Sequence, residues 1–175
     1  LGLAFELVSL RVKPASLALN ITKELSIATN NMIAGQVYDT LPPFGDDVDP
    51  MTRLQLTHRN KTGALIRGSC RIGAMCGEAD ADQLTALTNY GEAIGLMFQI
   101  VDDLLDVTST SDQLGKAAKK DAEQGKLTYP GICGIDGTRQ EVDRLRQSGI
   151  EALNIFGPEA ESLRALCEYM AVRTN

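Results

Sequence analysis

The chain has 175 residues, of which 43% are hydrophobic, and 17 lysines and arginines against 23 aspartates and glutamates give a formal charge of −6. This composition is typical of a globular protein. The negative net charge excludes the positive surface potential with which proteins bind nucleic acids. No run of 18 apolar residues and no signal peptide is visible, and the four cysteines lack CxxC spacing. The sequence therefore predicts a cytoplasmic protein in a reducing compartment, without a membrane span.

The beginning of the chain already follows a helical pattern. Apolar residues recur at helical spacing from Leu1 to Leu7, and the first methionine is Met32. We therefore expect the N-terminal part of the protein to be missing, and residues 1–175 to form the C-terminal part of a single domain.

Nearly every long segment carries the 3.6-residue period of a helix, and no alternating run indicates a strand. Proline and glycine pairs end several segments, and aspartates stand at two candidate N-termini, Asp49 before Pro50 and Asp80 before Ala81. Helices are predicted over residues 15–38, 50 to about 75, 81 to about 108, 138–156 and 158–173, with a connection over 131–137. The predicted fold is all-α, a bundle of long antiparallel helices around a central cavity.

Three aspartates interrupt the most apolar of these helices. At about 100° per residue, one face of this helix holds Gln99, Asp102, Asp103 and Asp106. The flanking positions are apolar, so we expect this acidic stripe to line a cavity. Carboxylates about 4 Å apart repel by about 1 kcal/mol even in water, and Mg²⁺ with phosphate oxygens would supply the counter-charge. The alternative is a solvated acidic face near the end of the helix.

Candidate cations lie on both sides of the acidic stripe. Lys61 and Thr62 stand in the middle of a predicted helix, whereas Lys116 and Lys126 lie on glycine-bearing loops downstream. Lysines and hydroxyls suit phosphate oxygens, so these groups could bracket a metal-bound diphosphate. The alternative for the cluster around Lys116 is an ordinary solvated group of lysines.

Taken in chain order, these segments resemble the motifs of the trans-isoprenyl diphosphate synthases, the family that includes farnesyl and geranylgeranyl diphosphate synthases. The matching motifs are GQVYD at 35–39, KTGAL at 61–65, FQIVDDLLD at 98–106, GK at 115–116, Asp121 and KLTYP at 126–130. The resemblance covers essentially the whole chain. It implies an isoprenoid synthase fold and a homodimer.

The resemblance also implies roles for individual residues. It implies Mg²⁺ ligands at Asp102, Asp103 and Asp106, and diphosphate contacts from Lys61, Lys116 and Lys126. By the same resemblance, Thr62 and Gln99 line the site, and Gln36 and Asp39 face the reaction cavity. The family's first aspartate-rich motif and its basic residues for isopentenyl diphosphate have no counterpart in this chain.

The implied activity is a prenyltransferase that condenses an allylic diphosphate with isopentenyl diphosphate. Mg²⁺-assisted ionisation of the allylic diphosphate would lead to a longer trans-prenyl diphosphate. Because the first aspartate-rich motif is lacking, we expect this chain alone to be inactive. For the same reason, the alternative is a non-catalytic subunit that binds prenyl diphosphates or a catalytic partner. A class I terpene cyclase is a further alternative, although its second metal motif usually has an Asn/Asp, Ser/Thr, Glu pattern.

Overall fold

The computed structural model describes residues 1–41, 43–45, 47–113 and 127–173, and its regular elements in this part of the chain are all helical. The prediction of an all-α fold is therefore confirmed. In chain order the helices are α1 (Gly2–Arg11), α2 (Ala15–Thr40), α3 (Pro50–His58), the π-helical turn η1 (Arg59–Gly63), α4 (Ala64–Cys76), α5 (Ala81–Gln113), α7 (Tyr129–Ala152), the 3₁₀ turn η2 (Pro158–Ala160) and α8 (Glu161–Val172). None of the helices within the described ranges is both long and apolar enough to cross a membrane.

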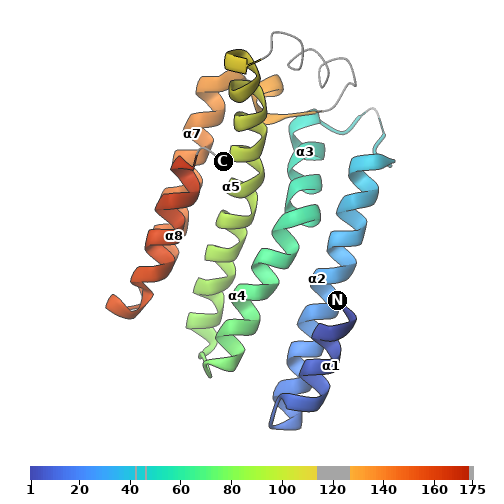
Figure 1. Ribbon diagram of the computed structural model, residues 1–175, viewed down its shortest axis with the longest axis vertical. Coiled ribbons are helices and arrows are strands. Elements are labelled where there is room, and N and C mark those ends of the chain that lie inside the picture. The colour runs from blue at the N-terminus through green and yellow to red at the C-terminus, as the bar shows by residue number, and fades with distance from the viewer. Residues whose placement is uncertain (42, 46, 114–126, 174–175) are drawn as a thin grey trace.

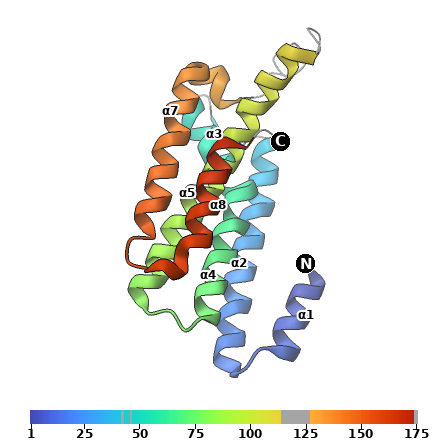
Figure 2. The ribbon, with the colours of Figure 1, turned by 60° about the vertical axis from the view of Figure 1, so that its left-hand side comes forward.

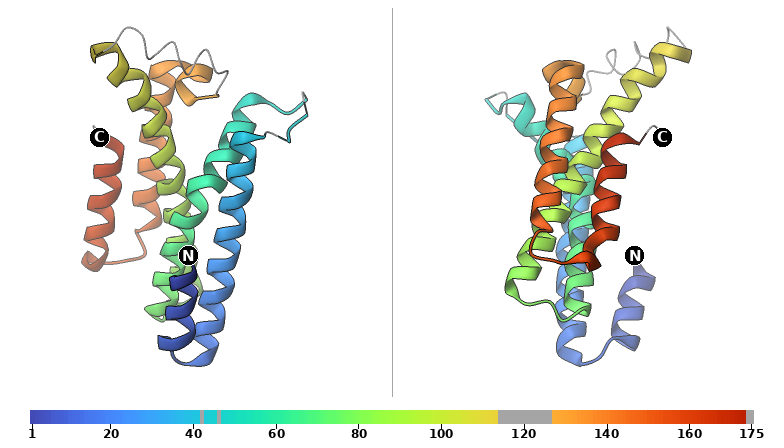
Figure 3. Two further views of the ribbon diagram at one scale, coloured as in Figure 1. Left: turned by 45° about the vertical axis from the view of Figure 1, so that its right-hand side comes forward. Right: turned by 90° about the vertical axis from the view of Figure 1, so that its left-hand side faces the viewer.

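The long helices stand side by side and alternate in direction (Figures 1 and 2). The continuous helix α3–η1–α4 lies between α2 and α5 and runs against both of them. On the other side of α5, helix α7 returns antiparallel to it, and α8 packs against α5 and α7 (Figure 3). Helices α2 and α5 therefore run in the same direction, with the α3–η1–α4 helix between them.

Two of the predicted helix starts are fixed by aspartate caps. The Asp49 carboxylate accepts a hydrogen bond from the Thr52 N–H at 2.9 Å, and Pro50 occupies the first helical position. At α5, the Asp80 carboxylate accepts from the N–H groups of Asp82 and Gln83, both at 2.9 Å. Each cap satisfies N–H groups that have no partner inside the helix, so these boundaries could be predicted from sequence.

The predicted connection over residues 131–137 is shorter in the structure, because helical residues reach up to a break at Gly134, which divides α7 into two segments. The helix begins at Tyr129, where the Thr128 hydroxyl accepts a hydrogen bond from the Gly131 N–H at 3.2 Å. The kink lies at Gly134, which has φ 73° and ψ 169°. Residues other than glycine rarely adopt this backbone conformation.

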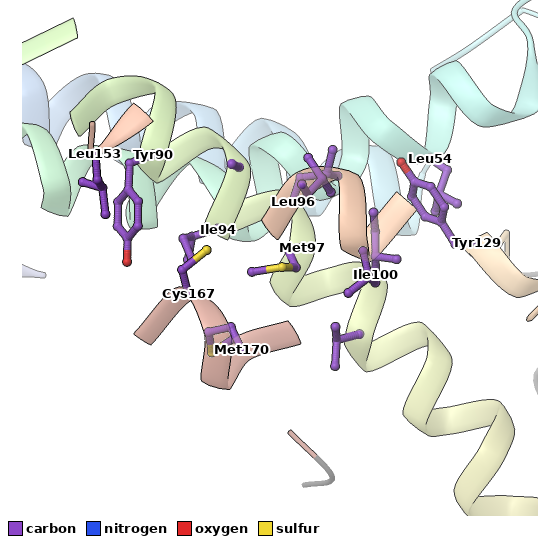
Figure 4. Packing of buried hydrophobic residues seen from close by; sticks show 14 residues of the cluster. Leu54, Tyr90, Ile94, Leu96, Met97, Ile100, Tyr129, Leu153, Cys167 and Met170 are labelled. Atoms are coloured by element: carbon purple, nitrogen blue, oxygen red, sulfur yellow. The ribbon is translucent and has the colours of Figure 1, made fainter. Parts of the chain in front are cut away.

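Helix α5 forms the centre of the hydrophobic core (Figure 4). Met97 and Ile100 on this helix are completely buried, and they pack with residues of α3, α7 and α8 such as Leu54, Tyr129 and Met170. Burial of each such side chain contributes about 1.5–3 kcal/mol relative to exposure. The core therefore holds rigidly the helix that carries the acidic stripe.

Candidate functional site

The candidate site begins at an irregularity in the helix that contains Lys61. Residues Arg59–Gly63 form a π-helical turn between α3 and α4, and this turn contains both Lys61 and Thr62. Such turns are rare and frequently occur at functional sites, because they change the direction of side chains within an otherwise regular helix. Sequence periodicity predicts a helix through this region but not the π turn.

Two glycines hold the π turn between its neighbouring helices. A Cβ atom on Gly35 of α2 would lie only 2.1 Å from the Lys61 backbone nitrogen, and one on Gly95 of α5 would lie 2.6 Å from the Gly63 Cα. Only glycine permits such close approach of backbones. The backbone that carries Lys61 is therefore clamped between α2 and α5.

The contacts of Gly35 and Gly95 with the π turn, here called the glycine clamp, fix the position of the site along the axis of the bundle. Because α2 and α5 run in the same direction, residues that follow Gly35 and Gly95 lie toward the same end of the molecule. An α-helix rises about 1.5 Å per residue, so along the helix axes Asp39 lies about 6 Å beyond Gly35 and Asp102 lies about 10 Å beyond Gly95. The structure thus brings parts of three predicted motifs to one end of the bundle.

Lys61 pairs with Asp39 across the helices. Its Nζ donates a hydrogen bond to Asp39 Oδ2 at 2.7 Å, and both side chains are partly exposed. A pair with this exposure contributes little to stability, so the ammonium group can exchange its partner at low cost. Thr62 is half-buried on the same turn, and Gln36 on α2 is exposed.

Asp102 meets a cation from the C-terminal end of the chain. Arg173, just after α8, forms an ion pair with Asp102 Oδ1, donates to the Phe98 carbonyl at 3.0 Å, and lies 4.5 Å from the centre of the Phe98 ring. Gln99 Nε2 donates to Asp102 Oδ2 at 3.2 Å. The Asp102 side chain nevertheless keeps 37% of its surface exposed.

Asp103 contacts other residues than Asp102 does. It is only 7% exposed, and its Oδ2 accepts a hydrogen bond from the Tyr129 N–H at 3.0 Å and lies 3.0 Å from His58 Nε2. The His58 and Tyr129 rings stack at 6.0 Å between centroids. The sequence alone indicated no partner for His58. His58 and Asp103 are 45 positions apart in the sequence, which explains why no spacing rule connects them.

The three aspartates therefore do not form a preassembled cage. Within residues 1–108 and 127–173, apart from 42 and 46, no three His, Cys, Asp or Glu side chains are grouped as metal ligands would be. Asp106 is exposed, and Lys116 and Lys126 lie outside the described residues. Asp102 and Asp106 still fit Mg²⁺, which takes oxygen donors, commonly only one or two carboxylates, and completes its shell with water and phosphate oxygens.

The fold and the site define an all-α isoprenoid synthase type of protein, in which an apolar central helix carries carboxylates and the adjacent π turn carries a lysine. The chain belongs to the polyprenyl synthetase family, whose sequence pattern it matches over residues 2–153. It is 39% identical over 180 residues to a geranylgeranyl pyrophosphate synthase, chloroplastic, of Catharanthus roseus, an alignment that covers 100% of this chain and 50% of the relative.

Solved structures agree with this family assignment. An FPP/GFPP synthase from Zymomonas mobilis in its apo form superimposes with a TM-score of 0.80 at 28% identity, covering 97% of this chain and 57% of that one. A geranyltransferase from Helicobacter pylori, complexed with magnesium and isoprenyl diphosphate, gives a TM-score of 0.74 at 25% identity, covering 97% and 55%. The chain spans about half the length of the sequence relatives that it matches.

The relatives also correct one expectation. The prediction of a cytoplasmic protein is wrong, because the matching synthases of Catharanthus roseus and Arabidopsis thaliana are chloroplastic or mitochondrial. That prediction rested on the absence of a visible signal peptide in residues 1–175, and this absence does not bear on delivery to an organelle.

Proposed function

We propose that this chain is the part of a Mg²⁺-dependent trans-prenyltransferase that binds the allylic diphosphate. The whole protein would condense that diphosphate with isopentenyl diphosphate to form a longer trans-prenyl diphosphate. The observation that carries the proposal is the glycine clamp on η1, which holds Lys61 at the same end of the bundle as the carboxylates of α5. Membership of the polyprenyl synthetase family supports it.

The proposed chemistry is mainly electrostatic. Asp102 and Asp106 would hold Mg²⁺, which when bound stabilises the negative charge of a departing diphosphate. Lys61 would release Asp39 and donate to a phosphate oxygen instead, which is feasible because both side chains are partly exposed. Lys116 and Lys126 are proposed to contact the same diphosphate.

The remaining predicted residues would shape the cavity in which the allylic cation forms. Thr62 and Gln99 are proposed to line the diphosphate site, and Gln36 and Asp39 to face the reacting carbons. An allylic cation must be kept from water, and the apolar side chains around α5 suit that task. No side-chain nucleophile is needed, because the double bond of isopentenyl diphosphate would attack the cation. The carbocation formed in this way would then lose a proton to the released diphosphate, which restores a double bond.

The test is condensation by the full-length gene product. Isopentenyl diphosphate is offered with Mg²⁺ and with dimethylallyl, geranyl or farnesyl diphosphate, and the products are separated by chain length. We expect a longer prenyl diphosphate in the presence of Mg²⁺ and none with a chelator. Lys61→Met should raise the KM for the allylic diphosphate about 10-fold or more, since one charge-assisted contact is lost. Lys23→Met on the exposed face of α2 should not change it.

The second candidate function is a non-catalytic subunit. The observation that favours it is the absence of a group of three metal ligands among the described residues. One relative is named the large subunit of a heterodimeric geranylgeranyl pyrophosphate synthase in Arabidopsis thaliana. If the full-length product binds pyrophosphate but condenses nothing under any of these conditions, this second function replaces the first.

We also propose that the full-length protein forms a homodimer. Apolar side chains are exposed on α1 and α2, among them Leu3, Leu7, Leu19 and Ile33. Exposed apolar surface of this extent is usually covered by protein. Light scattering on the full-length product should give twice the mass of one chain.

A further inference from the structure

We propose that Asp103 is a positioning residue and not a metal ligand. Together with His58 it would fix the start of α7 against α3 and α5, and so set the spacing of the diphosphate-binding groups. This assignment rests on the proposed function and changes the role that the family resemblance implies for Asp103.

The three aspartates of α5 differ sharply in their surroundings. Asp103 is 7% exposed, whereas the Asp102 side chain is 37% exposed and Asp106 is also open to solvent. His58, the partner of Asp103, is 5% exposed. A metal ion that keeps several waters and takes up a diphosphate needs carboxylates that solvent can reach. The Asp102 and Asp106 side chains are exposed to this degree, whereas Asp103 is buried.

The same oxygen of Asp103 joins three segments of the chain. Oδ2 lies 3.0 Å from His58 Nε2 and accepts from the Tyr129 N–H at 3.0 Å. His58 precedes Lys61 by three residues on the same continuous helix, and Tyr129 follows Lys126 by three residues in the sequence. The contact thus links α5 to the helix that contains Lys61 and to the first residue of α7.

The free N–H groups at the start of α7 explain why the Asp103 carboxylate is favourable there. The first N–H groups of a helix have no partner inside the helix and attract negative charge. In α7, Pro130 has no N–H, the Thr128 hydroxyl accepts from the Gly131 N–H, and Asp103 accepts from the Tyr129 N–H. If Asp103 turned toward a metal ion, the Tyr129 N–H would lose its acceptor in a buried place.

The substitution Asp103→Asn separates the two roles. The asparagine Oδ1 can replace Oδ2 and accept from both Tyr129 and His58, so the contact remains while the charge and most of the affinity for Mg²⁺ are lost. Asp103→Leu removes the contact as well. On the other side of the contact, His58→Gln keeps a side-chain N–H donor, whereas His58→Leu does not. Asp102→Asn serves as the matched ligand variant on the same helix.

The measurement is calorimetric binding of inorganic pyrophosphate with Mg²⁺ to the full-length gene product, at a temperature where circular dichroism shows each variant fully folded. Asp103→Asn and His58→Gln should weaken binding by about threefold or less. Asp103→Leu and His58→Leu should weaken it about 10–100-fold, as is usual when a residue that orients a metal site is lost. Asp102→Asn should weaken it by at least as much.

Two results would overturn the assignment. If Asp103→Asn weakens binding as much as Asp102→Asn, Asp103 is a ligand. If Asp103→Leu binds like the wild type, the contact does not position the site. A wild-type protein that neither binds pyrophosphate nor condenses prenyl diphosphates would instead refute the proposed function, and with it this role.

Discussion

Replacement of Gly35 by alanine tests the clamp on which the candidate site depends. An ideal Cβ at this position would lie 2.1 Å from the Lys61 backbone nitrogen and 2.6 Å from both the Asn60 carbonyl carbon and the Lys61 Cα. All three are backbone atoms, so no flexible side chain can move aside. An ordinary contact begins near 3.4 Å, so α2 and η1 must separate by more than about 1 Å.

Two opposing effects decide the magnitude. Alanine in a helix interior is favoured over glycine by about 0.5–1 kcal/mol, because the unfolded chain loses less freedom. Overpacking of a well-packed contact costs about 1–3 kcal/mol, and occasionally more when backbone must shift. We therefore expect Gly35→Ala to lower the free energy of unfolding by about 1–2 kcal/mol and to displace Lys61 from the end of α2.

The assay is urea unfolding of the full-length gene product, followed by circular dichroism at 222 nm, together with pyrophosphate binding by calorimetry. Gly73→Ala on α4 is the matched control, because nothing lies within 4 Å of a Cβ there. The control should gain up to about 1 kcal/mol of stability and bind as the wild type does. Equal unfolding free energies for Gly35→Ala and Gly73→Ala would refute the close approach of α2 to η1.

Three further predictions concern a cap, the acidic stripe and a thiol. Asp49→Ala should lower the free energy of unfolding by about 0.5–2 kcal/mol in the same urea assay, since the N-cap of α3 is lost. Asp102→Ala should weaken Mg²⁺-dependent pyrophosphate binding far more than Asp82→Ala at the start of α5, and equal effects in calorimetry would contradict the stripe as a metal site. Burial, followed by the charge of Glu168, raises the pKa of the Cys167 thiol to about 11, so this thiol should react with a disulfide reagent at pH 8 only on unfolding.

The fold was largely predictable because the cues for helices are local. The Asp49 and Asp80 caps satisfy N–H groups within three residues, and the helices begin where these caps predict. Over residues 131–137 the glycines predicted a connection, and the structure reduces it to a break at Gly134 between two helical segments. In the structure Gly134 absorbs a kink inside α7, and nothing local separates a kink from a connection.

The site was less predictable because its contacts join distant residues. Spacing and the family motifs singled out Lys61 and the aspartates, but no spacing rule connects Asp102 with Arg173, which is 71 residues away. The π turn also escaped prediction, since helical periodicity does not distinguish it from an α-helix and its close contacts come from glycines of two other helices. Contacts of this kind follow from the packing of the bundle as a whole.

Helix geometry explains why the aspartates of one acidic stripe have different surroundings. Adjacent residues on a helix point about 100° apart, so a stripe that includes both Asp102 and Asp103 is about 100° wide. One edge of the stripe then faces α8, where Asp102 meets Arg173, and the other faces α3 and α7, where Asp103 meets His58 and Tyr129. Three carboxylates at this spacing cannot all point at one ion without moving. The pattern read from sequence thus combines a partly exposed and an exposed aspartate, which we propose bind a cation, with a buried aspartate suited to hold the surrounding helices in place.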